Sequence, residues 1–160
     1  MNDLTSRALE LQHAAHELMY LGMDGEPVYS DTFCWLNKEV LVKSDSLFFA
    51  QSSDVEEEAN LCLALLMGYN ATIYDDGDKE QKKQMVLNRI CLVLEQLPAS
   101  LLKVRLLTYT YGEVYEEVLF QEAYAIIEGW NKDNLTSEQT VIIEELKNIE
   151  ENPYPFEEVE

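Results

Sequence analysis

The sequence is short of basic residues, glycine, proline and histidine, and it has no long apolar run. Its 160 residues include 11 Lys and Arg against 31 Asp and Glu, which gives a formal net charge of −20 at pH 7. Because a charge of this sign repels phosphates, we expect no direct binding of nucleic acid. The longest apolar run, residues 61–67, is far shorter than the ~20 residues of a membrane-spanning helix, so we expect no membrane partner.

The cysteines are also few. The chain has three of them, and an odd, widely spaced set does not predict a disulfide framework. Cys62 and Cys91 fall within apolar helical patterns, whereas Cys34 lies outside them. We expect buried, reduced thiols, which are typical of a cytoplasmic protein. The N-terminal segment also lacks the basic start of a signal peptide, which favours the same location.

The scarcity of helix breakers predicts a chain that is mostly helical. Apolar residues recur at steps of three and four from Leu4 to Leu18, which predicts an amphipathic helix closed by Gly22. A second helix is expected near residues 33–36, with Ser30 or Asp31 as its cap. Within residues 40–51 we expect helical or irregular structure, and a small β-hairpin is the alternative.

Capping signals and breakers mark the remaining helices. Ser53 with Glu56, and Thr136 with Gln139, have the spacing of a capping box, and the apolar residues 61–67 predict a buried central helix. The full set of expected boundaries comprises helix starts near Ser53, Lys79, Ala99, Glu113 and Thr136, and breaks at Tyr74–Asp78, Pro98 and Gly112. We therefore predict an all-α fold, a single compact bundle of about six or seven helices over residues 1–150, followed by an acidic mobile tail at 151–160.

The sequence contains no strong catalytic motif. His13 and His16 are three residues apart on a helix, but no HExxH pattern accompanies them, so exposed histidines are the favoured interpretation. Asp76-Gly77-Asp78 resembles the DxD of some glycosyltransferases, yet the chain lacks the strand–helix alternation that would present it. Cys34 could act as a nucleophile only beside a general base, and no sequence spacing places such a base next to it. We expect no enzyme activity, no catalytic residue, no metal and no cofactor.

The distribution of the acidic residues is more informative. Residues 113–160 carry a net charge of −12, and residues 1–112 carry −8. Aromatic residues alternate with the acidic ones there, and such a surface can accept Lys and Arg side chains through carboxylates and ring faces. An ordinary solvated helix face is the competing interpretation. The partner-binding residues that we predict are Glu113, Glu116, Glu117, Glu144, Glu145 and Tyr124.

Two segments resemble the UpxZ family encoded in the capsular polysaccharide loci of gut bacteria: LTSRALELQHAAHELMYLGMDGEPVYSDTFCWLNKEVL and TYGEVYEEVLFQEAYAIIEGWN. The resemblance implies a regulator that antagonises transcription antitermination. In this family, the protein of one locus inhibits the NusG-like (UpxY-type) antiterminators of other, non-cognate loci. The implied partner is therefore such an antiterminator, bound directly as a protein.

Two other functions remain open at this stage. One is a generic acidic scaffold or nucleic-acid mimic without a specific antiterminator target, which would bind unrelated basic proteins. The other, more remote, is a metal-dependent nucleotide-sugar enzyme that uses Asp76 and Asp78. The sequence leaves the oligomeric state open.

Overall fold

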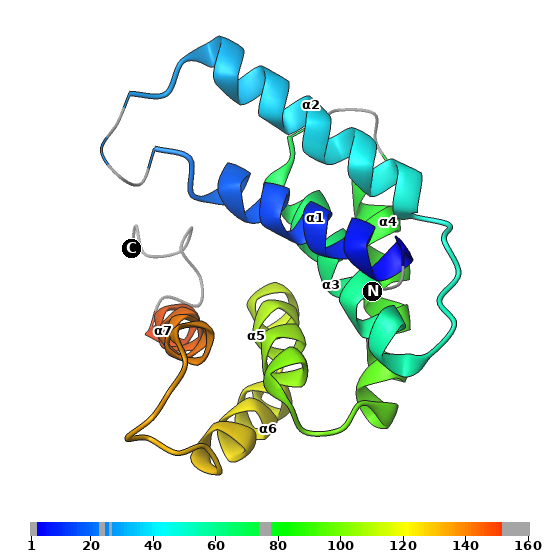
Figure 1. Ribbon diagram of the computed structural model, residues 1–160. Coiled ribbons are helices and arrows are strands. Elements are labelled where there is room, and N and C mark those ends of the chain that lie inside the picture. The colour runs from blue at the N-terminus through cyan, green and yellow to red at the C-terminus, as the bar shows by residue number, and fades with distance from the viewer. Residues whose placement is uncertain (1–2, 23–24, 26, 74–77, 152–160) are drawn as a thin grey trace. The chain divides into compact units, whose positions relative to one another are not determined.

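The computed structural model describes residues 3–22, 25, 27–73 and 78–151, and this part of the chain forms seven α-helices and no strand. The predicted all-α fold is therefore confirmed (Figure 1). None of the helices in the described ranges is both long and apolar enough to span a membrane. The helices are α1 (Asp3–Met19), α2 (Ser30–Leu47), α3 (Val55–Ala71), α4 (Lys79–Gln96), α5 (Leu101–Val114), α6 (Glu117–Glu128) and α7 (Ser137–Glu151).

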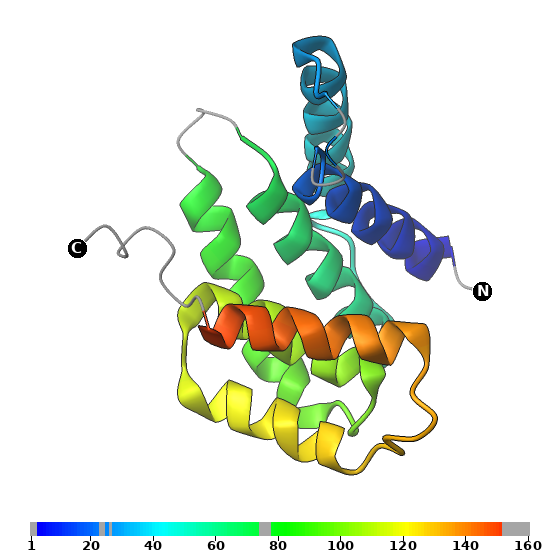
Figure 2. The same cartoon turned by 90° about the vertical axis from the view of Figure 1, so that its left-hand side faces the viewer.

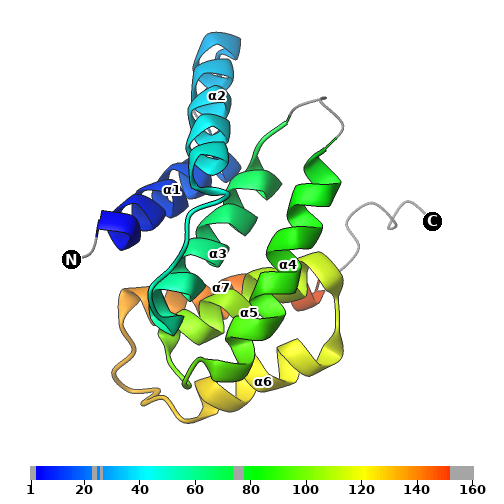
Figure 3. The same ribbon diagram turned by 90° about the vertical axis from the view of Figure 1, so that its right-hand side faces the viewer.

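The helices group into two compact units, Met1–Leu97 and Pro98–Glu160. In the N-terminal unit, α3 is the central helix and contacts α1, α2 and α4, as Figure 3 shows. In the C-terminal unit, α5 packs against both α6 and α7 (Figure 2). The division falls at Pro98, which lacks a backbone N–H and so cannot continue the hydrogen-bond ladder of α4. The single domain expected over residues 1–150 stays a prediction.

Helix α3 owes its central place to its apolar composition. Every residue from Leu61 to Tyr69 is buried, and the apolar side chains from Leu61 to Met67 have no exposed surface. Burying each large apolar side chain contributes roughly 1.5–3 kcal/mol. Gly68 allows α2 to approach, because a Cβ atom there would collide with the Ser44 hydroxyl. The prediction of a buried central helix is confirmed.

Helix α2 is longer than the sequence indicates. It runs without interruption to Leu47, so the hairpin alternative for residues 40–51 is wrong. A buried row at helical spacing, Leu36, Val40, Ser44 and Leu47, packs into the N-terminal unit. The Ser44 hydroxyl donates to the Val40 carbonyl at 2.9 Å, within the helix, instead of forming a turn. Burial of this row outweighs the β propensity of the segment.

Several predicted caps are displaced. Tyr29 occupies the N-cap position of α2 and makes no side-chain cap bond, so the assignment of Ser30 or Asp31 was wrong. The capping box expected at Ser53 and Glu56 lies one residue later, at Asp54 and Glu57. The carboxylate of Asp54 accepts from the N–H of Glu57 at 2.8 Å, and the Glu57 carboxylate accepts from the N–H of Ser53 at 2.6 Å. The amphipathic helix that ends before Gly22 is confirmed as α1, and Gly22 has a φ of +87°.

The C-terminal unit confirms one capping prediction and corrects others. The N–H of Thr136 donates to the Gln139 side chain at 2.9 Å, and the N–H of Gln139 donates to the Thr136 hydroxyl at 3.0 Å, as the capping box requires. Helix α5 begins after Ser100, whose hydroxyl accepts from the N–H of Lys103 at 3.1 Å. The helix therefore begins at Leu101, two residues after the expected start near Ala99.

Gly112 does not break α5, which continues to Val114, and α6 begins only at Glu117. The turn between them is made at Tyr115, whose φ of 56° and ψ of 35° are left-handed. An ideal Cβ on Gly112 would lie 3.3 Å from Cδ1 of Ile149. The glycine therefore permits close packing of α5 on α7, and the predicted break was wrong.

Candidate functional site

Acidic and aromatic side chains among the described residues of the C-terminal unit gather where the ends of three helices meet. We call it the acidic–aromatic corner. Helix α5 ends here, α6 begins here, and the close approach of Gly112 to Ile149 brings the end of α7 to the same place (Figure 2). Its residues are Tyr111, Glu113, Tyr115, Glu116, Glu117, Phe120, Tyr124, Glu150 and Glu151.

Four aromatic rings form the body of the corner. The ring of Tyr111 lies 5.8 Å from that of Tyr115 and 5.3 Å from that of Phe120, and Phe120 lies 4.6 Å from Tyr124. Each pair is tilted or edge-on, the arrangement that aromatic quadrupoles favour. Tyr111 is buried, whereas the other three rings are half-buried. The cluster therefore fixes the backbone and still presents ring surface at the edge of the unit.

The field at the corner is negative. Burial raises the pKa of Tyr124, and the neighbouring carboxylates of Glu150 and Glu151 raise it further. A phenol loses its proton less readily beside carboxylates because two negative charges would then lie close together. Glu116, Glu117, Glu150 and Glu151 are all exposed and available to a cation. The corner can therefore accept Lys or Arg by charge pairing and by contact with ring faces.

The structure places four of the six predicted partner-binding residues in this corner. Glu116 and Glu117 are exposed, and Glu113 and Tyr124 are half-buried. Glu144 and Glu145 lie one to two turns before the end of α7, with Glu144 exposed and Glu145 half-buried. The binding role of all six stays a prediction.

The sequence-based selection omitted Glu150 and Glu151. The predicted acidic tail begins at residue 151, whereas α7 extends through Glu151. The available signal was the continuation of helical spacing beyond Ile149, but Pro153 and Pro155 drew the expected boundary too early. The tail at 152–160 lies outside the described residues.

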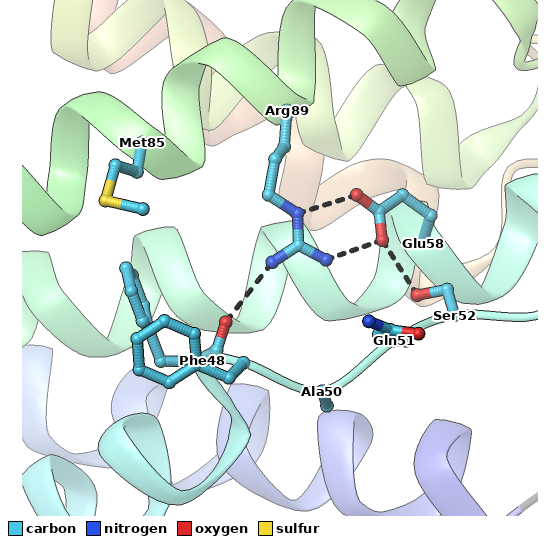
Figure 4. A pocket seen from close by; sticks show the side chains of 8 residues that line it. Phe48, Ala50, Gln51, Ser52, Glu58, Met85 and Arg89 are labelled. Atoms are coloured by element: carbon cyan, nitrogen blue, oxygen red, sulfur yellow. Dashed lines mark hydrogen bonds and ion pairs between the residues drawn. The ribbon is translucent and has the colours of Figure 1, made fainter.

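A second feature is a hollow of about 470 Å³ in the N-terminal unit, drawn in Figure 4. Its lining comes from the segment after α2, from Glu58 of α3, and from Met85 and Arg89 of α4. Arg89 donates from Nε and Nη2 to the Glu58 carboxylate at 2.8 and 2.7 Å, and from Nη1 to the Phe48 carbonyl at 3.3 Å. The guanidinium thus ties three segments of the unit together.

The charges at this hollow are satisfied internally. Burial alone would raise the pKa of Glu58, but hydrogen bonds from Arg89 and from the Ser52 hydroxyl outweigh it, so the pKa lies below its usual range. Cys62 lies behind the pair, with Sγ 3.5 Å from the Glu58 carboxylate. Burial, followed by the charge of Glu58, strongly raises the pKa of the Cys62 thiol. The thiol stays protonated and is a poor nucleophile.

The cysteine prediction is right for one residue only. Cys62 is buried, but Cys34 and Cys91 are exposed, and all three are free. In the row Leu87, Cys91 and Leu94 of α4, the leucines are half-buried and the thiol faces outward. A second apolar row of α4, which contains Val86, Ile90 and Val93, is buried in the core.

The candidate metal groups are not assembled. Within the described ranges, no three His, Cys, Asp or Glu side chains are grouped so that they could hold a metal ion. His13 is exposed, and the ring of His16 packs on that of Tyr20 with 4.5 Å between centroids. Asp76 lies outside the described residues, and Asp78 forms an ion pair with Lys82 at 3.3 Å.

The described residues thus form an all-helical protein with an exposed acidic and aromatic surface. The UpxZ family of transcription anti-terminator antagonists matches residues 8–112. A crystal structure of a transcription anti-terminator antagonist UpxZ from Bacteroides uniformis ATCC 8492 is similar, with 67% sequence identity, a TM-score of 0.89 and 99% of each chain covered. No curated protein matches the chain.

The chain therefore belongs to the UpxZ family of transcription anti-terminator antagonists. The predicted family is confirmed. The family is one of transcription regulators, and the partners implied by its description are of the antiterminator kind.

Proposed function

We propose that the chain is a cytoplasmic, non-enzymatic inhibitor that binds the NusG-like (UpxY-type) antiterminators of other capsular polysaccharide loci. The observation that carries this proposal is its membership of the antagonist family over most of its length. The acidic–aromatic corner supports a mechanism of direct binding. We expect an antiterminator that works on polymerase and nascent RNA to carry basic patches, and carboxylates beside ring faces suit such patches.

In this mechanism the corner docks on the antiterminator and blocks its contact with polymerase or with leader RNA. Exposed Glu116 and Glu117 at the start of α6 and Glu150 and Glu151 at the end of α7 would steer the encounter. Steering by exposed charges speeds association and weakens as salt screens the field beyond ~10 Å. Binding would therefore weaken at high salt.

The test is a binding titration against purified antiterminators of the chain's own locus and of foreign loci, at low and high salt. We expect tight, salt-sensitive binding to foreign antiterminators and weak binding to the cognate one. Absence of binding to every antiterminator would refute direct antagonism. Binding that does not change with salt would remove the corner from the mechanism.

Charge reversals locate the interface. Each single replacement by Lys should weaken binding about threefold to tenfold at Glu113, Glu116 and Glu117. Combinations of these replacements should weaken binding further. Reversal of Glu144 and Glu145 tests whether the surface extends along α7. The matched control is Glu95→Lys, an exposed position on α4 with the same change of charge. Equal effects at the corner and at Glu95 would show that only net charge matters.

The net charge of −20 also favours a second candidate, a generic nucleic-acid mimic. Such a protein would bind unrelated DNA-binding proteins as tightly as antiterminators. A panel of basic proteins in the same titration separates the two. Selective binding to antiterminators supports antagonism, and uniform binding supports the mimic.

A further inference from the structure

The outward face of α2 carries large apolar side chains at intervals of seven residues. Trp35 is 65% exposed, Val42 is 58% exposed, and Phe49, just beyond the last turn, is 81% exposed. Seven residues are close to two helical turns, so these side chains form one stripe along the helix. The buried row from Leu36 to Leu47 lies on the other side of α2, toward α1 and α3. In Figure 1, no other helix of the N-terminal unit covers the outer side of α2.

We propose that this stripe is the contact between two copies of the chain, with α2 packed antiparallel on α2 of the second copy. The stripe is symmetric about Val42, because an aromatic residue stands seven positions before it and another seven positions after it. An antiparallel pair with its two-fold axis at Val42 sets the two valines against each other. It also sets Trp35 of each copy against Phe49 of the other. A surface that complements itself in this way is what an isologous dimer requires.

The hollow described above gives each Trp35 a place to bind. Phe49, which is 81% exposed, lines this hollow of about 470 Å³. Met85, which is 50% exposed, Phe48 and the Arg89 guanidinium also line it, as Figure 4 shows. In the proposed register, the indole of the second copy lies at the level of Phe49 and covers Met85. A tryptophan seated in a pocket beside aromatic, methionine and arginine side chains has the composition of interface hot spots.

The charges on α2 allow two copies of this helix to approach each other. The chain as a whole carries −20, but α2 has three acidic and two basic residues, which leaves −1. In an antiparallel pair, residues on the same flank face each other across the contact. On one flank, Lys38 lies within one turn of Asp45 of the second copy. On the other, Glu39 lies within one turn of Lys43 of the second copy. Within the described part of its own chain, Lys43 pairs with Glu10 at 3.4 Å and Asp45 pairs with Lys82 at 3.1 Å, whereas no ion pair involves exposed Lys38. The contacts with the second copy would add to these pairs.

The affinity of the dimer should change with salt in the direction opposite to that of antiterminator binding. Bringing two chains of −20 together costs repulsion that salt screens, while the contact itself is mainly apolar. Dimerisation should therefore strengthen as salt rises. Sedimentation equilibrium of the full-length chain at low and high salt should show a reversible dimer that is tighter at high salt. A chain that stays monomeric at every concentration and salt level overturns the proposal.

Substitutions on the stripe test its role. Trp35→Glu should weaken the dimer at least about tenfold, because both symmetry-related anchors are lost, and Val42→Glu should do the same. Lys38→Glu should weaken it by about threefold to tenfold, since it faces Asp45 twice in the dimer. Lys147→Glu on α7 is the matched control and should leave the dimer unchanged. Circular dichroism should show native helix content in all variants, because these side chains are exposed.

Cross-linking tests the register. In a Cys34→Ser, Cys91→Ser background, Val42→Cys should form a disulfide-linked dimer under oxidised glutathione, and Val118→Cys on α6 should not. Glu39→Cys chains should cross-link to Ser46→Cys chains more readily than to themselves, because only the antiparallel register brings these positions together. Self-linking of Glu39→Cys, or dimers that ignore all of these changes, would overturn the proposal. So would a monomer whose stripe variants lose only antiterminator binding.

Discussion

Replacing Arg89 with methionine tests how much the contacts of this one side chain stabilise the N-terminal unit. Methionine keeps most of the apolar stem and removes three hydrogen bonds, two to Glu58 and one to the Phe48 carbonyl. The charged bonds would each be worth about 1.5–3 kcal/mol if they were fully buried. The two side chains are 28% and 23% exposed, so solvent screens the pair. We therefore expect the free energy of unfolding to fall by about 2–3 kcal/mol in total.

The assay is urea denaturation followed by far-UV circular dichroism, carried through a double-mutant cycle with Glu58→Gln. The double variant should lose less than the sum of the single variants, with a coupling of about 1–2 kcal/mol. The control is Lys43→Met, which breaks an exposed ion pair with Glu10 at 3.4 Å and should change stability by less than ~0.5 kcal/mol. If Arg89→Met were as mild as this control, or if the cycle gave no coupling, the clamp would have no stabilising role.

Three further predictions concern stability. The pKa of Glu58 is lowered in the folded chain, so its contribution is complete above the ordinary pKa of a glutamate and is lost as pH falls through the folded pKa. Wild type should thus lose more stability on acidification than Glu58→Gln, in parallel urea titrations, and equal slopes would contradict this. Asp54→Ala and Thr136→Ala should each cost about 1 kcal/mol through a lost helix cap, measured by thermal denaturation. Gly68→Ala should cost about 1–3 kcal/mol by collision with the Ser44 hydroxyl, and adding Ser44→Ala should recover part of that loss.

The full length of helix α2 could not be predicted from the sequence. Residues 40–51 contain valine, phenylalanine and serine, which suit a hairpin as well as a helix. The choice depends on whether Leu36, Val40, Ser44 and Leu47 find a surface to cover, and α1 and α3 provide that surface. A packing partner that lies far away in sequence leaves no local signal. Residues 40–51 by themselves therefore do not distinguish a hairpin from a helix.

The candidate site shows a similar division. The rise of acidic and aromatic residues beyond position 112 identified Glu113, Glu116, Glu117 and Tyr124 as surface candidates. The sequence could not show that α7 returns its end to the same corner, because that return depends on the contact between Gly112 and Ile149. Nothing local in the sequence therefore groups Glu150 and Glu151 with these residues, and the early helix boundary left them out as well.

The sequence by itself determined the all-helical class, the buried identity of α3, the family and the strong negative charge. These properties follow from composition, from periodicity and from extended similarity, all of which are local or additive along the chain. Only the tertiary structure decided which glycines serve close packing, which cysteines are exposed, and that Trp35, Val42 and Phe49 are left uncovered on one face of α2. Those facts depend on which helices pack against each other. The sequence of one segment does not specify which distant segment it contacts.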